Sequence, residues 1–157
     1  MRNSKNIYYI LLLIVLIYGC NKSPKCWGEK VSSDGIIETE FNPCLNCNIL
    51  TNPDSTYVIN SDLEYQSLSL LAHSNQTVCQ FENINFNNYT LLGKSVWASC
   101  KYKLKRNVTE DKPNNKYIYT IELKECGNCS DLTKIDNWVL VPKIPIGYAV
   151  DFVFIRK

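Results

Sequence analysis

The amino-acid sequence predicts a mainly β domain with one short helix, an α+β fold whose antiparallel sheet or small sandwich is disulfide-stapled. Three observations predict this fold class. Apolar and polar residues alternate with a period of two through most of the C-terminal half, as they do in half-buried strands. One capping-box motif, at residues 61–64, marks the start of a helix. The 157 residues also include eight cysteines, and disulfides commonly reinforce small exported domains.

The N-terminal part of the chain is expected to be rich in loops. Over residues 27–60, short apolar pieces alternate with turn-forming pairs at residues 34–35, 42–43 and 52–53. Only residues 56–60, Thr-Tyr-Val-Ile-Asn, have the composition of a short strand.

A helix is predicted to start directly after this strand. In a capping box, the Ser61 hydroxyl accepts from the backbone N–H of Glu64, and the Glu64 carboxylate accepts from the N–H of Ser61. The helix is expected to run for about ten residues. Its apolar side is expected to contain Leu63, Leu68, Leu70 and Leu71.

The rest of the chain is expected to form strands. Alternating patterns place them at residues 89–93, 95–108, 117–125, 137–142 and 148–155. Residues 110–115 contain proline and two asparagines and are predicted to be a hairpin loop, so that the two longest strands pair antiparallel.

The second of these strands has two distinct faces. Successive side chains of a strand point to opposite sides of the sheet. One side is apolar and is expected to face the core, with Tyr102, Leu104 and Val108. The other carries Lys101, Lys103 and Lys105, and such a face is more often solvated than a binding patch.

The first 19 residues have the plan of a signal peptide. Arg2 and Lys5 precede an apolar run over residues 7–18, which ends at Gly19-Cys20. A membrane-spanning helix needs about 20 apolar residues, so this run is too short to span. We therefore expect residues 1–19 to be removed, residues 20–25 to form a tether, and residues 26–157 to form a single exported domain.

The residues Ile17-Tyr18-Gly19-Cys20 resemble a bacterial lipobox. In proteins with this motif the cysteine takes a diacylglycerol, the signal is cut off and the new amine is usually acylated. The resemblance implies that Cys20 is the lipidation site and that a lipid bilayer is a partner, since two or three acyl chains anchor stably. An ordinary secretory signal, with Cys20 as one more disulfide cysteine, and an uncleaved anchor are the alternatives.

Three further segments carry a second resemblance. Residues 58–64, 84–93 and 138–145 are similar to parts of small bacterial lipoproteins of flavobacteria and their relatives, most of which have no assigned activity. The similarity covers roughly residues 57–157 and implies a compact β-rich domain. Because Asn21 rather than an acidic residue follows the lipid site, similarity to known sorting signals implies an outer-membrane anchor facing the periplasm, with surface display as the alternative.

The charge balance excludes one class of partner. Loss of residues 1–19 removes Arg2 and Lys5 and no acid, which leaves 15 basic and 15 acidic residues. A nucleic-acid-binding domain usually has a basic excess. We therefore expect no nucleic-acid partner.

The cysteines are the residues most open to a functional interpretation. In an oxidising compartment, those beyond the lipid site are expected to form structural bridges. Seven is an odd number, so at most three intrachain bridges form and one thiol is left over. The disulfide candidates are Cys26, Cys44, Cys47, Cys79, Cys100, Cys126 and Cys129.

Two C-x-x-C pairs, residues 44–47 and 126–129, suggest other roles. Four thiolates can hold zinc, but export and the separation of the two pairs count against that. A thiol-disulfide oxidoreductase places such a motif before a long helix, and residues 130–136 leave room for barely two turns.

Strand parity favours one particular bridge. Cys100 shares parity with Tyr102, on the apolar face, and Cys129 shares parity with the apolar residues of the partner strand, Tyr117, Tyr119, Ile121 and Leu123. A loop centred near residue 112 places Cys100 opposite about Lys124. Parity therefore favours Cys100–Cys129, unless a bulge at Gly127 brings in Cys126 instead. Cys26 is expected to pair with Cys44 or Cys47.

No catalytic group is recognised in the sequence. His73 is the single histidine and lies at the end of the predicted helix, where a solvated or capping role is ordinary. A pair with Cys79 lacks a recognisable orienting group and oxyanion site. No catalytic residue, metal site or cofactor is therefore expected. Two function classes stay open: a non-enzymatic envelope binding or scaffold module with a protein or glycan partner, and a redox or metal-binding periplasmic protein.

Overall fold

The computed structural model describes residues 30–44, 48–49, 51–52, 54–73, 79–99, 101–126 and 131–157. Strands make up 59% of the described residues, and one short α-helix accompanies them there, so the prediction of a mainly β fold is confirmed. In chain order the elements are β1 Val31–Gly35, β2 Thr39–Glu40, β3 Asn48–Ile49, β4 Thr56–Ile59, α2 Asp62–Ser69, β5 Ala72–His73, β6 Tyr89–Ser99, β7 Tyr102–Asp111, the 3-10 turn η1 Lys112–Asn114, β8 Lys116–Glu125, β9 Leu132–Pro142 and β10 Ala149–Arg156.

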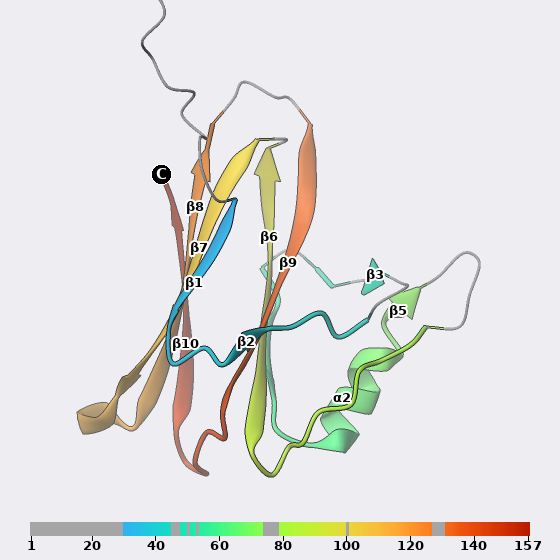
Figure 1. Cartoon of the computed structure of the whole chain (residues 1–157), viewed down its shortest axis with the longest axis vertical. Coiled ribbons are helices and arrows are strands. Elements are labelled where there is room, and N and C mark those ends of the chain that lie inside the picture. The colour runs from blue at the N-terminus through green and yellow to red at the C-terminus, as the bar shows by residue number, and fades with distance from the viewer. Residues whose placement is uncertain are drawn as a thin grey trace, which may run out of the picture.

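Two four-stranded sheets lie face to face (Figure 1). Sheet A has the strand order β1-β7-β8-β10, and sheet B has the order β2-β9-β6-β4. The short strands β3 and β5 form a separate antiparallel ribbon. Helix α2 lies on the side of sheet B that faces away from sheet A (Figure 1).

Sheet A is mixed rather than purely antiparallel. Its centre is the predicted antiparallel hairpin of β7 and β8, but β1 pairs parallel with β7, and β10 pairs parallel with β8. The reason is connectivity, since β1 continues into β2 of sheet B and β10 follows β9 of sheet B. Strands that arrive from another sheet are not constrained to the antiparallel direction that a hairpin turn imposes.

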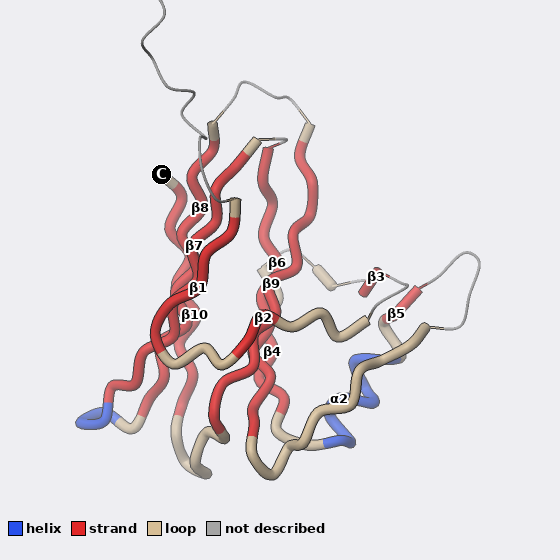
Figure 2. Tube along the Cα trace, viewed as in Figure 1, coloured by secondary structure: helices blue, strands red, loops and turns tan. Residues whose placement is uncertain are grey.

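The hairpin loop is shorter than predicted. Glu110 and Asp111 belong to β7, and η1 forms the tip, drawn in blue at the end of the hairpin in Figure 2. Asn115 closes the turn in the left-handed conformation, with φ of 50°, which asparagine tolerates better than most residues.

The expected break near Gly93 is wrong. Residues 89–99 form one strand, β6, and the expected strand over residues 95–108 is divided between β6 in sheet B and β7 in sheet A. Gly93 lies inside β6 because the Trp138 ring crosses it. A Cβ atom at residue 93 would lie 2.0 Å from a carbon of that ring, so glycine here serves packing and not a turn.

The main core lies between the two sheets. Leu104, Val108 and the predicted inward face of β8, Tyr117, Tyr119, Ile121 and Leu123, are all buried there, which confirms both predicted apolar faces. Tyr102 is half-buried and packs against the same cluster. On the opposite face Lys101 and Lys105 are exposed and Lys103 is partly exposed.

A second core joins sheet B to α2. The capping box is present in part: the Ser61 hydroxyl accepts from the Glu64 N–H at 3.3 Å, while the Glu64 carboxylate accepts from the N–H of Asn60, not of Ser61. The predicted apolar side is largely wrong, because the helix ends at Ser69 and buries Tyr65 and Leu68. Of the other predicted leucines, Leu63 and Leu70 are strongly exposed and Leu71 is exposed to a lesser degree.

The N-terminal part contains more strand than predicted. The turn pair at residues 34–35 ends β1, where Gly35 has φ of 79°. His73, predicted at a helix end, belongs to β5 and pairs with Asn48 of β3.

Candidate functional site

Most of the site residues predicted from sequence lie outside the described residues. These are Cys20, Cys26, Cys47, Cys100 and Cys129, so the lipidation site and the Cys100–Cys129 bridge are not among the described features. The strand register does correct one premise of that pairing. Lys124 lies opposite Lys103, not opposite Cys100, because the hairpin turns at residues 112–115 and not around residue 112.

Three predicted disulfide cysteines are described: Cys44, Cys79 and Cys126. Within the described part of the chain no two cysteine sulfurs lie at bonding distance. Each of these three nevertheless has a partner in the protein and is not an isolated side chain.

Neither C-x-x-C pair is described in full, since Cys47 and Cys129 fall outside the described ranges. Among the described residues, no group of three or more histidine, cysteine, aspartate or glutamate side chains could hold a metal ion. Nor does the described part include a helix long and apolar enough to cross a membrane.

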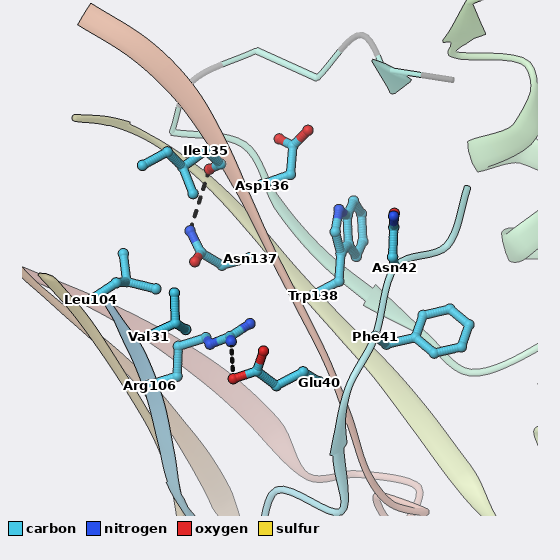
Figure 3. Close-up of a pocket in the computed structure, with 10 residues that line it drawn as sticks. All are labelled: Val31, Glu40, Phe41, Asn42, Leu104, Arg106, Ile135, Asp136, Asn137 and Trp138. Carbon is cyan, nitrogen blue, oxygen red and sulfur yellow. Dashed lines mark hydrogen bonds and ion pairs between the residues drawn. The ribbon is translucent and has the colours of Figure 1, made fainter. Parts of the chain in front are cut away.

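The described surface has a cleft at one edge of the sandwich, where β1 and β7 of sheet A approach β2 and β9 of sheet B. We call this the edge cleft. It has a volume of about 390 Å³ and is lined by the ten residues drawn in Figure 3. Val31, Leu104 and Ile135 give it an apolar wall, and Arg106 lies beside them (Figure 3).

Arg106 is the unusual residue of the edge cleft. Its alternation with Leu104 and Val108 turns it toward the core, and it is only 5% exposed. Its Nη2 forms an ion pair with Oε1 of Glu40, an oxygen that also accepts from the Ser33 hydroxyl at 3.0 Å. A buried guanidinium is costly unless it is paired, and Glu40 supplies that pairing from the other sheet.

The pairing of Arg106 is incomplete. Its Nε is buried and has no hydrogen-bond acceptor among the described residues, and the Tyr119 hydroxyl is equally buried and unpartnered there. Burial raises the pKa of Tyr119, the charge of Arg106 lowers it, and the charge of Glu40 raises it. Unsatisfied buried polar groups are rare in folded proteins, so the unpartnered Nε of Arg106, a residue that lines the cleft, points to a site for a further polar group.

The sequence contains a pattern that marks Arg106 as unusual. Along β7 the core-facing positions are 102, 104, 106 and 108, and three of these four residues are apolar or aromatic. An arginine in such a row is a mismatch between pattern and residue, which often marks a functional position. Glu40 carries no comparable signal, since it lies in a two-residue strand within a region predicted to be loop.

A polar cluster on sheet B is a structural feature instead. The Ser95 hydroxyl donates to Asp136 at 2.5 Å, and Lys134 forms an ion pair with Asp136 at 3.2 Å and donates to the Ile49 carbonyl. Thr51 joins the same network. Because Ser95 is 1% exposed, its hydroxyl is out of reach of a substrate, and the cluster holds Ile49 and Thr51 to the sheet.

A second hollow, of about 370 Å³, lies between β4 and α2. Glu64 is its one charged lining residue, and that carboxylate already accepts from the N–H of Asn60. It therefore offers less to a polar ligand than the edge cleft does.

Known proteins provide no analogy for the edge cleft. Comparisons with protein families, with curated proteins and with solved structures each found no match. Function is therefore inferred from the N-terminal motif and from the chemistry of the edge cleft.

Proposed function

We propose that this protein is a lipid-anchored, non-enzymatic binding module of the cell envelope, and that the edge cleft is its ligand site. The observation that carries the proposal is the position of Arg106, a buried cation with an unsatisfied Nε on the wall of an open cleft. Binding sites combine apolar walls with a few well-placed polar groups, and the edge cleft has this composition.

The anchor rests on the motif that ends at Cys20 and on the apolar run before it. Acylation there would attach the domain to the outer membrane, facing the periplasm, where an envelope protein or glycan is the expected partner. Residues 21–25 would then separate the sandwich from the lipid.

Disulfide bridges are the second part of the proposal. In an oxidising compartment they would staple the segments that cover sheet B to the rest of the domain. Cys44, Cys79 and Cys126 each have a partner in the protein, which supports this idea. Their positions also fit it, because Cys44 packs in the core beside α2, Cys79 lies against the same cluster, and Cys126 follows β8.

Processing is tested by mass spectrometry of the protein from cells. We expect a mature N-terminus at an acylated Cys20, and accumulation of unlipidated precursor in the Cys20→Ser variant. An unmodified Cys20 in a mature protein would refute the anchor. Rapid digestion by protease added to intact cells would refute the periplasmic orientation.

Ligand binding is tested by an NMR screen of small aromatic and aliphatic fragments against isotope-labelled protein. We expect shifts to gather on edge-cleft residues, with Asn137 and Trp138 as reporters. Shifts that gather elsewhere would contradict this placement.

The alternative function is a redox or metal-binding protein that uses a C-x-x-C pair. A titration of free thiols, with and without a zinc chelator, distinguishes it from the binding module. Two or more free thiols, or thiols released by the chelator, would favour it over the binding module.

A further inference from the structure

We infer that the edge cleft binds a small carboxylic acid with an apolar body, whose carboxylate replaces that of Glu40 on Arg106. This inference rests on the proposed function, because it names the ligand class of the same cleft.

The first step concerns what Arg106 can recognise. A guanidinium presents a planar fork of N–H groups that matches a carboxylate through two parallel hydrogen bonds. Only Nη2 pairs with Glu40, and Nε has no acceptor among the described residues. An incoming carboxylate can therefore offer more than Glu40 does, with one oxygen on Nη2 and the other on Nε.

The second step concerns why Glu40 can leave. The side chain of Glu40 is 53% exposed, whereas that of Arg106 is 6% exposed. Glu40 also lies on β2, a two-residue strand at the border of sheet B. The Glu40 carboxylate can rotate into water at little free-energy cost, because it is already largely hydrated. Arg106 stays buried and then needs another anion.

The third step concerns the body of the ligand. Figure 3 shows Val31 and Leu104 beside Arg106 on the sheet A side of the cleft, and Ile135 and the side chain of Asn137 across from them on β9. The Asn137 amide is held in place, because its Nδ2 donates to the carbonyls of Lys94 and Ile135 at 3.2 and 3.3 Å. A hydrocarbon group attached to the carboxylate would lie against this apolar wall.

The cleft volume sets the size of the ligand. About 390 Å³ is at the small end of the range of roughly 300–1,000 Å³ for ligand sites. A carboxylic acid with one ring or a short chain fits that space.

The test is a titration of the purified full chain with benzoate and with benzamide, its neutral analogue of the same shape. Shifts of the Arg106 Nε–H and of the Asn137 amide are followed by NMR. We expect benzoate to saturate the shifts of both signals. Benzamide should bind at least about tenfold more weakly, which corresponds to a binding free energy weaker by about 1.4 kcal/mol.

Three variants make the test specific. Glu40→Gln removes the internal competitor and should tighten benzoate binding by about tenfold. Arg106→Gln should abolish the preference for benzoate over benzamide. The control Glu38→Gln makes the same charge change at an exposed neighbour outside the lining of the cleft, and should leave benzoate binding unchanged.

Some outcomes would overturn the inference. Equal binding of benzoate and benzamide in the cleft would refute the carboxylate class and leave the cleft as a ligand site. No response of the cleft to benzoate at millimolar concentration would also refute it. Neither of these two outcomes decides the proposed function. That proposal is tested by the modification of Cys20 and by the residues at which the fragment-induced NMR shifts gather. If Glu40→Gln does not fold, the comparison of benzoate with benzamide in wild type and Arg106→Gln decides.

Discussion

Arg106 and Glu40 join the two sheets of the sandwich by an ion pair whose members differ in exposure, with 6% of the Arg106 side chain and 53% of the Glu40 side chain accessible. Arg106 comes from β7 of sheet A and Glu40 from β2 of sheet B. Loss of one partner should therefore have a very different effect from loss of the other.

We predict that Glu40→Gln destabilises the protein by about 2 kcal/mol, because it leaves a buried cation without its anion. Arg106→Met should cost less than about 1 kcal/mol, because the freed Glu40 is hydrated and an apolar chain fills the space. Urea denaturation measures both. Asp34→Asn, which breaks the exposed pair with Lys105, is the control and should leave the midpoint unchanged. The reverse order of the two losses would contradict the role assigned to burial.

Gly93→Ala should destabilise the protein by about 1–3 kcal/mol, because the new methyl group would overlap the Trp138 ring. Chemical denaturation measures the loss of stability caused by Gly93→Ala in the wild-type background and in a Trp138→Leu background. If Trp138 is the cause, this loss should fall below about 1 kcal/mol in the Trp138→Leu background. Gly147→Ala is the matched control. It has φ of 91° and nothing within 4 Å, so only backbone strain of about 1 kcal/mol is expected. An equal penalty for Gly93→Ala in both backgrounds would mean that Trp138 is not the cause.

Ser61→Ala should cost about 1 kcal/mol, because it removes the side-chain acceptor for the Glu64 N–H at the start of α2. Ser67→Ala is a matched control within the same helix. Its hydroxyl donates to the Leu63 carbonyl. The loss of this bond in Ser67→Ala should be offset by the higher helix propensity of alanine. Thermal melts of the two variants should therefore differ, and equal midpoints would argue against the capping role.

Tyr119→Phe should lessen the loss of stability in alkaline solution. Burial raises the pKa of Tyr119, so the stability that depends on its proton is fully present below the ordinary tyrosine pKa of about 10 and is lost as pH rises toward the folded-state pKa. Above pH 10 the wild type should lose about 1.4 kcal/mol per pH unit more than the variant. Urea denaturation between pH 8 and pH 11.5 measures the slopes, and parallel slopes would contradict the prediction.

At neutral pH the same variant should be at least as stable as wild type. The Tyr119 hydroxyl is buried without a partner among the described residues, so its removal relieves an unsatisfied group, worth about 1 kcal/mol.

Reduction of the proposed disulfides should lower the melting temperature sharply. A bridge that closes a loop of some 30 residues contributes roughly 3 kcal/mol in the chain-entropy model, a large share of the stability of a small domain. Melting curves with and without reductant, together with non-reducing peptide mapping, measure this contribution. A melting temperature that does not move would reject the stapling role and favour the redox or zinc alternative.

The sequence predicted those parts of the fold that depend on local pattern. The inward faces of β7 and β8 follow directly from alternation, and the hairpin between them follows from its turn residues. Alternation does not identify the sheet to which a strand belongs, which is why one expected strand over residues 95–108 is divided between two sheets. It also does not fix direction, so the parallel pairing of β10 with β8 was not foreseen.

The pairing of Arg106 with Glu40 was beyond the reach of local pattern for a different reason, although the alternation along β7 marks Arg106 itself. Arg106 and Glu40 meet because β1 leads from sheet A into β2 of sheet B, and no motif records that path. The same applies to α2, where tertiary packing selects Tyr65 and Leu68 over the more obvious leucines.

The parallel pairing at both edges of sheet A constrains the order in which the strands of this sheet can assemble during synthesis. Ribosomes deliver the N-terminus first, yet β8 receives its outer neighbour only from β10, Ala149–Arg156. Until then the edge of β8 presents unpaired backbone groups, and such edges promote association between chains. The arrival of Phe152 beside the Tyr119 ring, with centroids 5.7 Å apart, is thus among the final steps, and a chain that stops before residue 149 would leave sheet A unfinished.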